Sequence, residues 1–205
     1  ILDWRVLGYE EKEPWIERSN TKQDKFNKEV NEKTEVFLRD EFLKVLEEDL
    51  KDFDFEFSID SIDSQTILCK YPKIFESNYL TQNIRLEIGS LAAWTPAIDV
   101  KILPIISEAY PNVFKEKTNI RTVSAERTFL EKATILHHEA NRPESSPMPH
   151  RYARHFYDLY KIVNSDYKNR ALEDKDLLKK VTEFKMKFYP RKWARYEEAL
   201  NGRLR

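Results

Sequence analysis

The spacing of apolar residues along this chain changes from helical to strand-like near residue 53 and back to helical near residue 104. Between residues 21 and 50, Phe26, Val30, Phe37 and Leu46 belong to a series with three- and four-residue steps, which indicates one long helix or two helices with a bend. From residue 53, apolar and polar residues alternate, as in "FDFEFSI", which is typical of a half-buried strand. The two changes of period therefore predict an α+β fold.

Four segments predict strands, and the short links between them favour a mostly antiparallel sheet in residues 53–103: "FDFEFSI", "QTILCKY", "NIRLEIGS" and "AIDVKIL". A helix and turn are expected in "PIISEAYPNVF", and helices at 125–141 with Ser124 as N-cap, at 150–163, at 173–188 with the acidic "EDKD" as its cap, and in "RKWARYEEAL". We therefore predict a four-stranded sheet preceded by a helix and followed by a C-terminal helical bundle. The expected domains are 1–104 and 105–205.

Charge and cysteine content exclude several classes of protein. With 35 basic and 36 acidic residues, a protein that coats nucleic acid over its whole surface is not expected, although a local basic patch stays open. The single cysteine, Cys69, excludes an internal disulfide, fits a cytoplasmic location and is expected to be a buried structural thiol. No run approaches the roughly 20 apolar residues that a membrane span needs.

Two of the predicted helices carry a charged residue beside their apolar stripe. In "ERTFLEKATILHHEA", Lys132 lies three residues after Phe129, and in "RYARHFYDLYKI", Asp158 directly precedes Leu159. The spacing alone favours an ordinary interpretation: the lysine stem covers apolar surface, and Arg154 and Asp158 form a surface ion pair of about 0.3–0.5 kcal/mol. The alternative is a functional site at which the two stripes pack together.

The same two segments carry a resemblance to a known family. The shared residues, in this order and at compatible spacing, are Arg127, Thr128, Phe129, Glu131, Lys132 and Leu136, then Arg151, Tyr152, Arg154, Asp158 and Leu159. This pattern resembles the AbiEii/AbiGii toxin family of nucleotidyltransferases, within the DNA polymerase β-like superfamily. The segments "IRLEIGS" and "WARYEEALNGRLR" are similar to the family as well.

The resemblance implies a function. Such proteins transfer a nucleotide from an NTP to an acceptor such as a tRNA, as the toxin of a bacterial toxin–antitoxin or phage-defence pair. The implied partner is a cognate antitoxin, which in this family often acts without a stable complex. The implied cofactor is Mg²⁺, since acidic residues of such enzymes hold two ions that activate the nucleophile and steady the leaving pyrophosphate.

The resemblance also implies roles for individual residues. Lys132 would contact the triphosphate, and Asp158 would orient that lysine or the nucleotide. Glu87, on the polar face of its strand, fits the third acidic residue of the metal cluster; an exposed glutamate paired with Arg85 is the alternative. Arg151, Arg154 and His137 are further candidates for nucleotide binding.

One part of the family pattern is not found in this sequence. The Gly-Ser turn and the following Asp-x-Asp pair, which approach phosphate and hold the metals, do not occur, and the aspartates of "IDSID" (59–63) have the wrong spacing and lie in an expected turn. The chain starts at Ile1 in "ILDW", which resembles the residues that follow the Asp-x-Asp strand in relatives. The resemblance thus places those elements before Ile1, and residues 1–205 alone are not expected to catalyse transfer. The alternative is a truncated or degenerate relative that binds nucleotide, RNA or a partner without catalysis.

The histidines allow a further hypothesis. His137, His138, Glu139 and His150 suggest zinc, but adjacent helical histidines point about 100° apart and no HExxH motif occurs. Arg142, Arg151 and Arg154 with His150 and His155 form a basic group around the break between two helices. This group is expected either to be a solvated helix end or to contact RNA or triphosphate.

Overall fold

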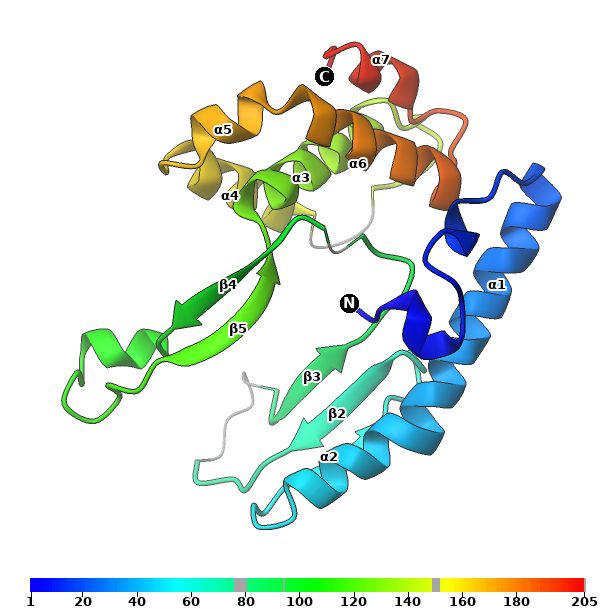
Figure 1. The fold of residues 1–205 in the computed structure, drawn as a ribbon. Coiled ribbons are helices and arrows are strands. Elements are labelled where there is room, and N and C mark those ends of the chain that lie inside the picture. Colours follow the sequence, from blue (N-terminus) through cyan, green and yellow to red (C-terminus); the bar gives the residue numbers. More distant parts are fainter. Residues whose placement is uncertain (76–80, 94, 149–151, 205) are drawn as a thin grey trace. The chain divides into compact units, whose positions relative to one another are not determined.

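A computed structural model of the chain describes residues 1–75, 81–93, 95–148 and 152–204. The chain divides into two compact units, Ile1–Ala92 and Ala93–Arg205 (Figure 1). The domain boundary after residue 104 that the sequence suggested stays a prediction. The mixed content of helices and small antiparallel sheets confirms the predicted α+β class.

The first unit is built on a long helical segment. Two short 3₁₀ turns, Trp4–Leu7 and Glu13–Trp15, precede α1 (Asn20–Phe37), which continues through a π-helical stretch, Leu38–Phe42, into α2 (Leu43–Asp49). The buried positions of this segment, at helical spacing, are Gln23, Phe26, Val30, Thr34 and Leu38. The prediction of one long or bent helix is therefore confirmed, and the π stretch marks the change between its two halves.

A three-stranded antiparallel sheet completes the first unit. Its order is β1 (Glu56–Ile59), β2 (Thr66–Lys70), β3 (Asn83–Glu87), with β2 in the middle and Ile67 fully buried. Cys69 is buried and unpaired, and burial raises the pKa of its thiol, as expected of a structural cysteine. The sheet is tied to α1 by a buried hydrogen bond of 2.6 Å between the hydroxyls of Thr34 and Ser90.

The aspartates of "IDSID" shape the turn between β1 and β2, as predicted. Asp60 accepts a hydrogen bond from the backbone N–H of Ile62 at 2.9 Å, and Asp63 accepts one from that of Gln65 at 3.1 Å. Side-chain acceptors of this kind fix a turn by replacing backbone partners. Asp60 also pairs with Arg85 of β3, and its pKa is lowered first by the Ile62 N–H and then by Arg85.

The second unit begins with a two-stranded ribbon, which corrects the predicted four-stranded sheet. The strand in "AIDVKIL", β4 (Ala97–Ile102), pairs with β5 (Thr118–Val123) in a separate sheet, after a 3₁₀ turn at Ile105–Glu108. β5 was not predicted because "TNIRTV" has no regular alternation of apolar and polar residues. Its pairing with β4, and not its own pattern, makes it a strand.

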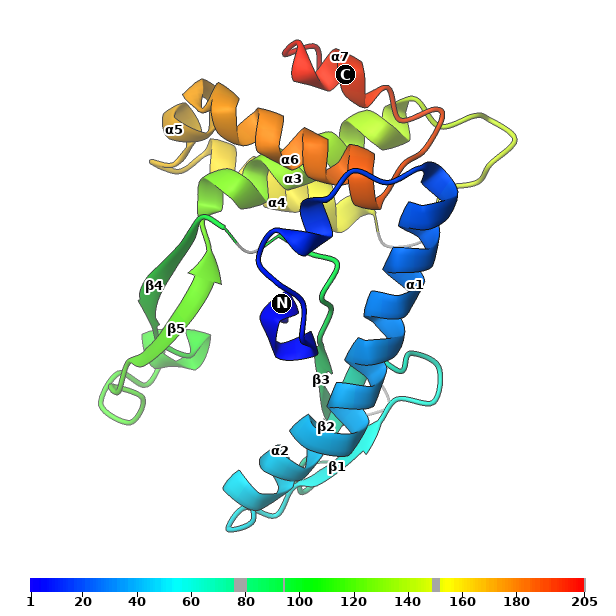
Figure 2. The ribbon, with the colours of Figure 1, turned by 45° about the vertical axis from the view of Figure 1, so that its right-hand side comes forward.

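Helices form the remainder of the second unit (Figure 2). They are α3 (Ala125–Ala140), α4 (Ala153–Val163), α5 (Lys168–Glu173), α6 (Lys175–Phe188) and α7 (Tyr196–Leu200). The predicted N-cap Ser124 is confirmed, since it accepts from the N–H of Arg127 at 3.2 Å. Within the acidic "EDKD", which was expected to cap α6, Asp174 accepts from the N–H of Leu177 at 2.8 Å. α5 was not predicted.

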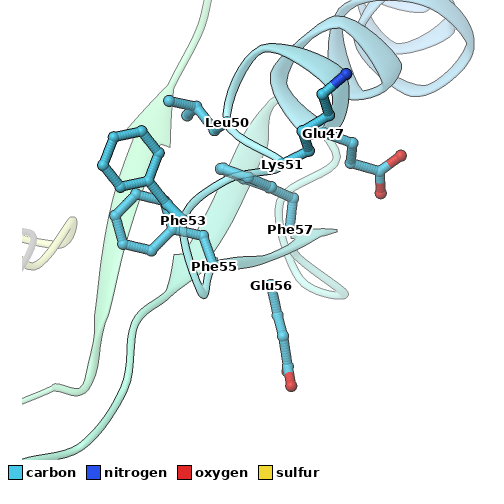
Figure 3. A pocket seen from close by; sticks show the side chains of 7 residues that line it. All are labelled: Glu47, Leu50, Lys51, Phe53, Phe55, Glu56 and Phe57. Carbon is cyan, nitrogen blue, oxygen red and sulfur yellow. The ribbon is translucent and has the colours of Figure 1, made fainter.

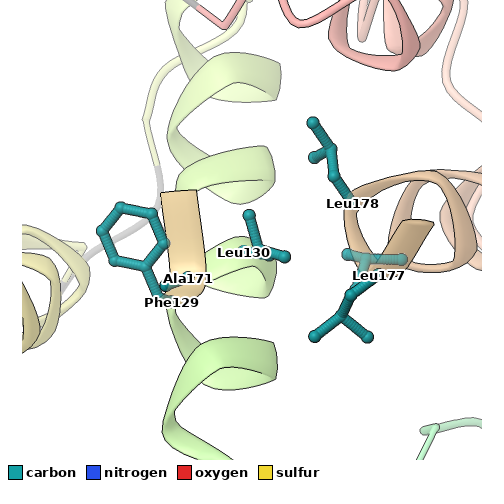
Figure 4. Close-up of a cluster of buried hydrophobic side chains, with 6 residues drawn as sticks. Phe129, Leu130, Ala171, Leu177 and Leu178 are labelled. Atoms are coloured by element: carbon teal, nitrogen blue, oxygen red, sulfur yellow. The ribbon is translucent and has the colours of Figure 1, made fainter. Parts of the chain in front are cut away.

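The core of the second unit lies between α3, α5 and α6. Figure 4 shows Leu130 of α3 facing Leu177 and Leu178 of α6; the whole cluster is Phe129, Leu130, Ala171, Leu177, Leu178 and Val181. From α4, Leu159, Ile162 and Val163 pack against it. Phe156, predicted to belong to the same stripe of α4, is instead 58% exposed.

Candidate functional site

The face of α3 that is buried differs from the one the sequence suggested. Instead of Ala133, Leu136 and Ala140, the structure buries Leu130, Thr134 and His137 of this helix, together with Arg127. The polar members find partners: the Thr134 hydroxyl donates to the carbonyl of Leu130 at 2.8 Å, and His137 Nε2 donates to that of Arg195 at 2.9 Å. This rotation of the buried face leaves Lys132 at the side of α3 that faces α4.

Lys132 and Asp158 form the centre of the candidate site. The Lys132 amine lies 3.4 Å from a carboxylate oxygen of Asp158, and the two side chains keep 25% and 38% of their surface exposed. The predicted juxtaposition of the two residues is thus present, whereas the described residues contain no ion pair between Arg154 and Asp158. A lysine held by an aspartate and open to solvent on one side can receive an anionic ligand.

His155 lies beside this pair. Its side chain is 5% exposed, and burial, followed by the charges of Lys132 and Arg154, lowers its pKa. Among the described residues its Nδ1 atom has no hydrogen-bond partner. Burial thus disfavours the charged form of the ring next to the two charged residues.

A second set of charges adjoins Lys132 on α3. Arg127 pairs with Glu131 at 2.8 Å and also donates to the carbonyl of Thr95. Lys185, from α6, donates from its amine to the backbone carbonyl of Glu131 at 2.9 Å. Burial, first of all, lowers the pKa of Lys185 to about 7, and the charges of Lys132 and Arg127 act in the same direction.

Lys185 is a residue that the sequence prediction missed, although a signal existed. Lys185 lies four residues after Val181 and seven after Leu178, so helical spacing places it on the apolar face of α6. A charged residue on the apolar face of a helix suggests a functional role, and this signal is as strong for Lys185 as for Lys132 and Asp158.

The other predicted nucleotide-binding residues lie in different settings. His137 is fully buried and bonded to Arg195, so this geometry gives no support to a contact with nucleotide. Arg154 is exposed on α4. Arg151, like His150, lies outside the described residues. The predicted roles of these residues stay predictions.

The predicted metal ligand, Glu87, lies at the end of β3 in the first unit. Its side chain is 72% exposed, and Arg85 Nε lies 3.8 Å from its carboxylate, which is the arrangement named above as the alternative. Within the described residues no group of three or more His, Cys, Asp or Glu side chains could hold a metal ion. These residues therefore do not fit a two-magnesium centre, and His137, His138 and Glu139 do not fit a zinc site.

His138, Glu139 and Arg142 form a buried network near α7. Glu139 pairs with Arg142, whose guanidinium is the main cause of the lowered pKa of the Glu139 carboxyl. His138 lies against Trp193 and Tyr196, with ring centroids 5.7 and 6.1 Å away, and burial lowers its pKa. These contacts join the end of α3 to α7. They give His138, Glu139 and Arg142 a structural role.

The pockets found in the first unit do not suit a triphosphate. One of about 320 Å³ is lined by three phenylalanines (53, 55 and 57) with two acidic residues, Glu47 and Glu56, and one basic residue, Lys51 (Figure 3). The charged residues that line another, of about 380 Å³, are three glutamates (29, 32 and 41) and one lysine, Lys33, so carboxylates outnumber amines in both pockets. Carboxylates around a pocket disfavour an anionic ligand by charge repulsion.

The fold and the charged helices together define a class: an α+β protein whose helical unit presents a lysine–aspartate pair to solvent. Comparison with family models gives the particular family, since the model described as "Nucleotidyl transferase AbiEii toxin, Type IV TA system" matches residues 17–204. The chain therefore belongs to the AbiEii family of nucleotidyl transferase toxins, which confirms the resemblance noted in the sequence. Comparisons with curated proteins and with solved structures gave no significant match. No helix among the described residues is long and apolar enough to cross a membrane.

Proposed function

We propose that this protein transfers a nucleotide from an NTP to an RNA acceptor such as a tRNA, with Lys132 contacting the triphosphate and Asp158 positioning the lysine. The observation that carries the proposal is the 3.4 Å pair between Lys132 and Asp158 on two facing helices of a family member. A compact ammonium group on a flexible stem is well suited to the charge of a phosphate. Asp158 would hold that group in place until the nucleotide arrives.

Several parts of the proposal rest on the family. A cognate antitoxin, a cytoplasmic location and a role in phage defence are what toxins of this class imply. Magnesium would supply the charge neutralisation of phosphoryl transfer. Because the acidic residues of the described ranges do not form a site for it, the roles of Lys132 and Asp158 are proposed independently of the metal.

The proposal is tested by incubating the protein, expressed from its natural start codon, with each of four labelled NTPs and total tRNA. We expect label to enter RNA with the wild type, and Lys132→Ala and Asp158→Ala to reduce the rate by about 10²-fold or more, since the first removes the charge that contacts the phosphates and the second removes the group that positions it. Lys161→Ala, an exposed lysine of α4, is the matched control and should retain full activity.

Two outcomes would count against the proposal. Near-full activity of Lys132→Ala would remove the role assigned to this lysine. Binding of NTP or RNA without any transfer by the wild type would favour the alternative, a relative that binds without catalysis.

A further inference from the structure

Lys185, a partly buried lysine of α6, is a charge that the proposed site leaves unexplained. Its amine lies on the inner side of α6 against α3, and the only hydrogen bond it makes among the described residues is to the carbonyl of Glu131. That carbonyl already accepts a hydrogen bond from the hydroxyl of Thr134 at 2.9 Å. The amine is therefore not needed to satisfy the helix backbone.

The charges around Lys185 are not balanced within this part of the second unit. When the Lys185 amine is protonated, Arg127, Lys132 and Lys185 carry three positive charges, whereas Glu131 and Asp158 carry two negative ones. Each carboxylate is paired with another residue: Glu131 with Arg127 at 2.8 Å and Asp158 with Lys132 at 3.4 Å. The attraction of Glu131 therefore offsets only part of the cost of burying the Lys185 amine. Burying a cation without a carboxylate partner is unfavourable unless something else supplies the negative charge.

The position of Lys185 suggests that the negative charge comes from a ligand held by Lys132. Its amine is bonded to the backbone of the residue directly before Lys132, and the two lysines interact electrostatically. They come from α6 and α3, which lie side by side in both ribbon views (Figures 1 and 2). Four flexible carbons allow the Lys185 amine to leave the carbonyl and turn toward a ligand held by Lys132.

We propose that Lys185 is a second phosphate-binding lysine, which acts with Lys132 to hold the triphosphate of the nucleotide. The inference rests on the proposed function, and it extends the site from α3 and α4 to α6. An anionic ligand would supply the charge that Lys185 lacks. Binding would therefore favour the ammonium form and draw a proton to this amine.

The expected result is an affinity for phosphate that depends on pH through Lys185. Because its pKa is lowered to about 7 in the free protein, the amine is already charged below pH 7 and must take up a proton to bind an anion above it. The dissociation constant of the wild type should thus rise by up to about tenfold for each pH unit above 7. The groups that face Lys185 from α3 and α4 and share in its titration are Arg127, Glu131, Lys132, His138 and His155.

The experiment measures binding of inorganic triphosphate to the intact protein by calorimetry, without metal, between pH 6.5 and 8.5. We expect Lys185→Met to bind at least about tenfold more weakly than the wild type at pH 6.5, and this difference to shrink by about tenfold at pH 8.5. Lys185→Arg keeps its positive charge throughout this pH range. Its dissociation constant for triphosphate should therefore not show the rise above pH 7 that is expected of the wild type. Comparing proteins at each pH cancels the titration of the ligand itself.

Control variants distinguish a wrong role for Lys185 from a wrong proposed function. Lys180→Met, an exposed lysine on the same helix, should bind like the wild type, and thermal melting checks that each variant is folded. If Lys185→Met binds like the wild type at every pH while Lys132→Ala has lost binding, the role of Lys185 is overturned and the proposed function stands. If the wild type does not bind triphosphate at all, both are overturned.

Discussion

At the scale of single residues, the second unit carries charges that its stability does not require. The Lys132–Asp158 pair is partly exposed, so its contribution to the free energy of unfolding is of order 0–1 kcal/mol. Lys185 is more costly because its side chain is partly buried and forms no ion pair with a carboxylate among the described residues. Residues with strongly shifted pKa values cluster at functional sites, in agreement with the role in phosphate binding that we propose for Lys185.

Removing the buried charge of Lys185 should give a pH-dependent gain in stability. The pKa of Lys185 falls from 10.5 to about 7 on folding, so between these values the unfolded chain binds more protons, and stability rises with pH. The cost of the buried charge is therefore fully present below pH 7. We expect Lys185→Met to be more stable than the wild type at pH 6.5, and the gain to decrease by roughly 1.4 kcal/mol per pH unit between 7 and 10.

Urea denaturation of both proteins at several pH values measures this difference, with Lys180→Met as the control. A gain that does not change with pH would show that Lys185 is not buried as a titrating amine. Together with the binding experiment, the result separates a residue retained for ligand binding from one retained for packing.

At the scale of elements, the ends of the helices were easier to predict than the faces they bury. Ser124 and the acidic segment that contains Asp174 could be identified as caps because short polar side chains before an apolar series are a local signal. The buried face of α3 is a tertiary property: Arg127 and His137 are buried because the carbonyls of Thr95 and Arg195 accept their hydrogen bonds. Sequence spacing does not contain those partners.

The cap at Ser124 gives a prediction for α3. Ser124→Ala removes the acceptor for the N–H of Arg127 and should reduce the free energy of unfolding by about 1 kcal/mol. Ser145→Ala, in the exposed loop after α3, is a suitable control and should change it by less than about 0.5 kcal/mol. Equal stabilities of the two variants in urea would contradict the assigned cap.

At the scale of the whole molecule, the two compact units have separate cores. The first buries Val30, Leu38 and Ile67, and the second buries the cluster around Leu130 and Val181. The candidate site belongs to the second unit, and Glu87 to the first. The two residues of the candidate site, Lys132 and Asp158, therefore lie in one unit, and the predicted metal ligand lies in the other.

Separate cores predict separate responses to a cavity. Leu130→Ala should destabilise the second unit by about 2–5 kcal/mol, because it removes packing against Leu177 and Leu178. Hydrogen exchange should then quicken in α3 and α6 and stay unchanged in β2 and β3. Quickened exchange throughout both units would indicate that they unfold together.

The sequence by itself determined the order and type of most elements, the α+β class, the helix caps and the family, because each depends on neighbouring residues or on a motif read along the chain. It also indicated Lys132 and Asp158 as a pair. Only the tertiary structure decided that β4 pairs with β5 in a separate sheet, which face of α3 is buried, and that Lys185 lies against the carbonyl of Glu131. The physical reason is that pairing, burial and a shifted pKa depend on groups that are distant in sequence, and spacing along one element carries no information about them.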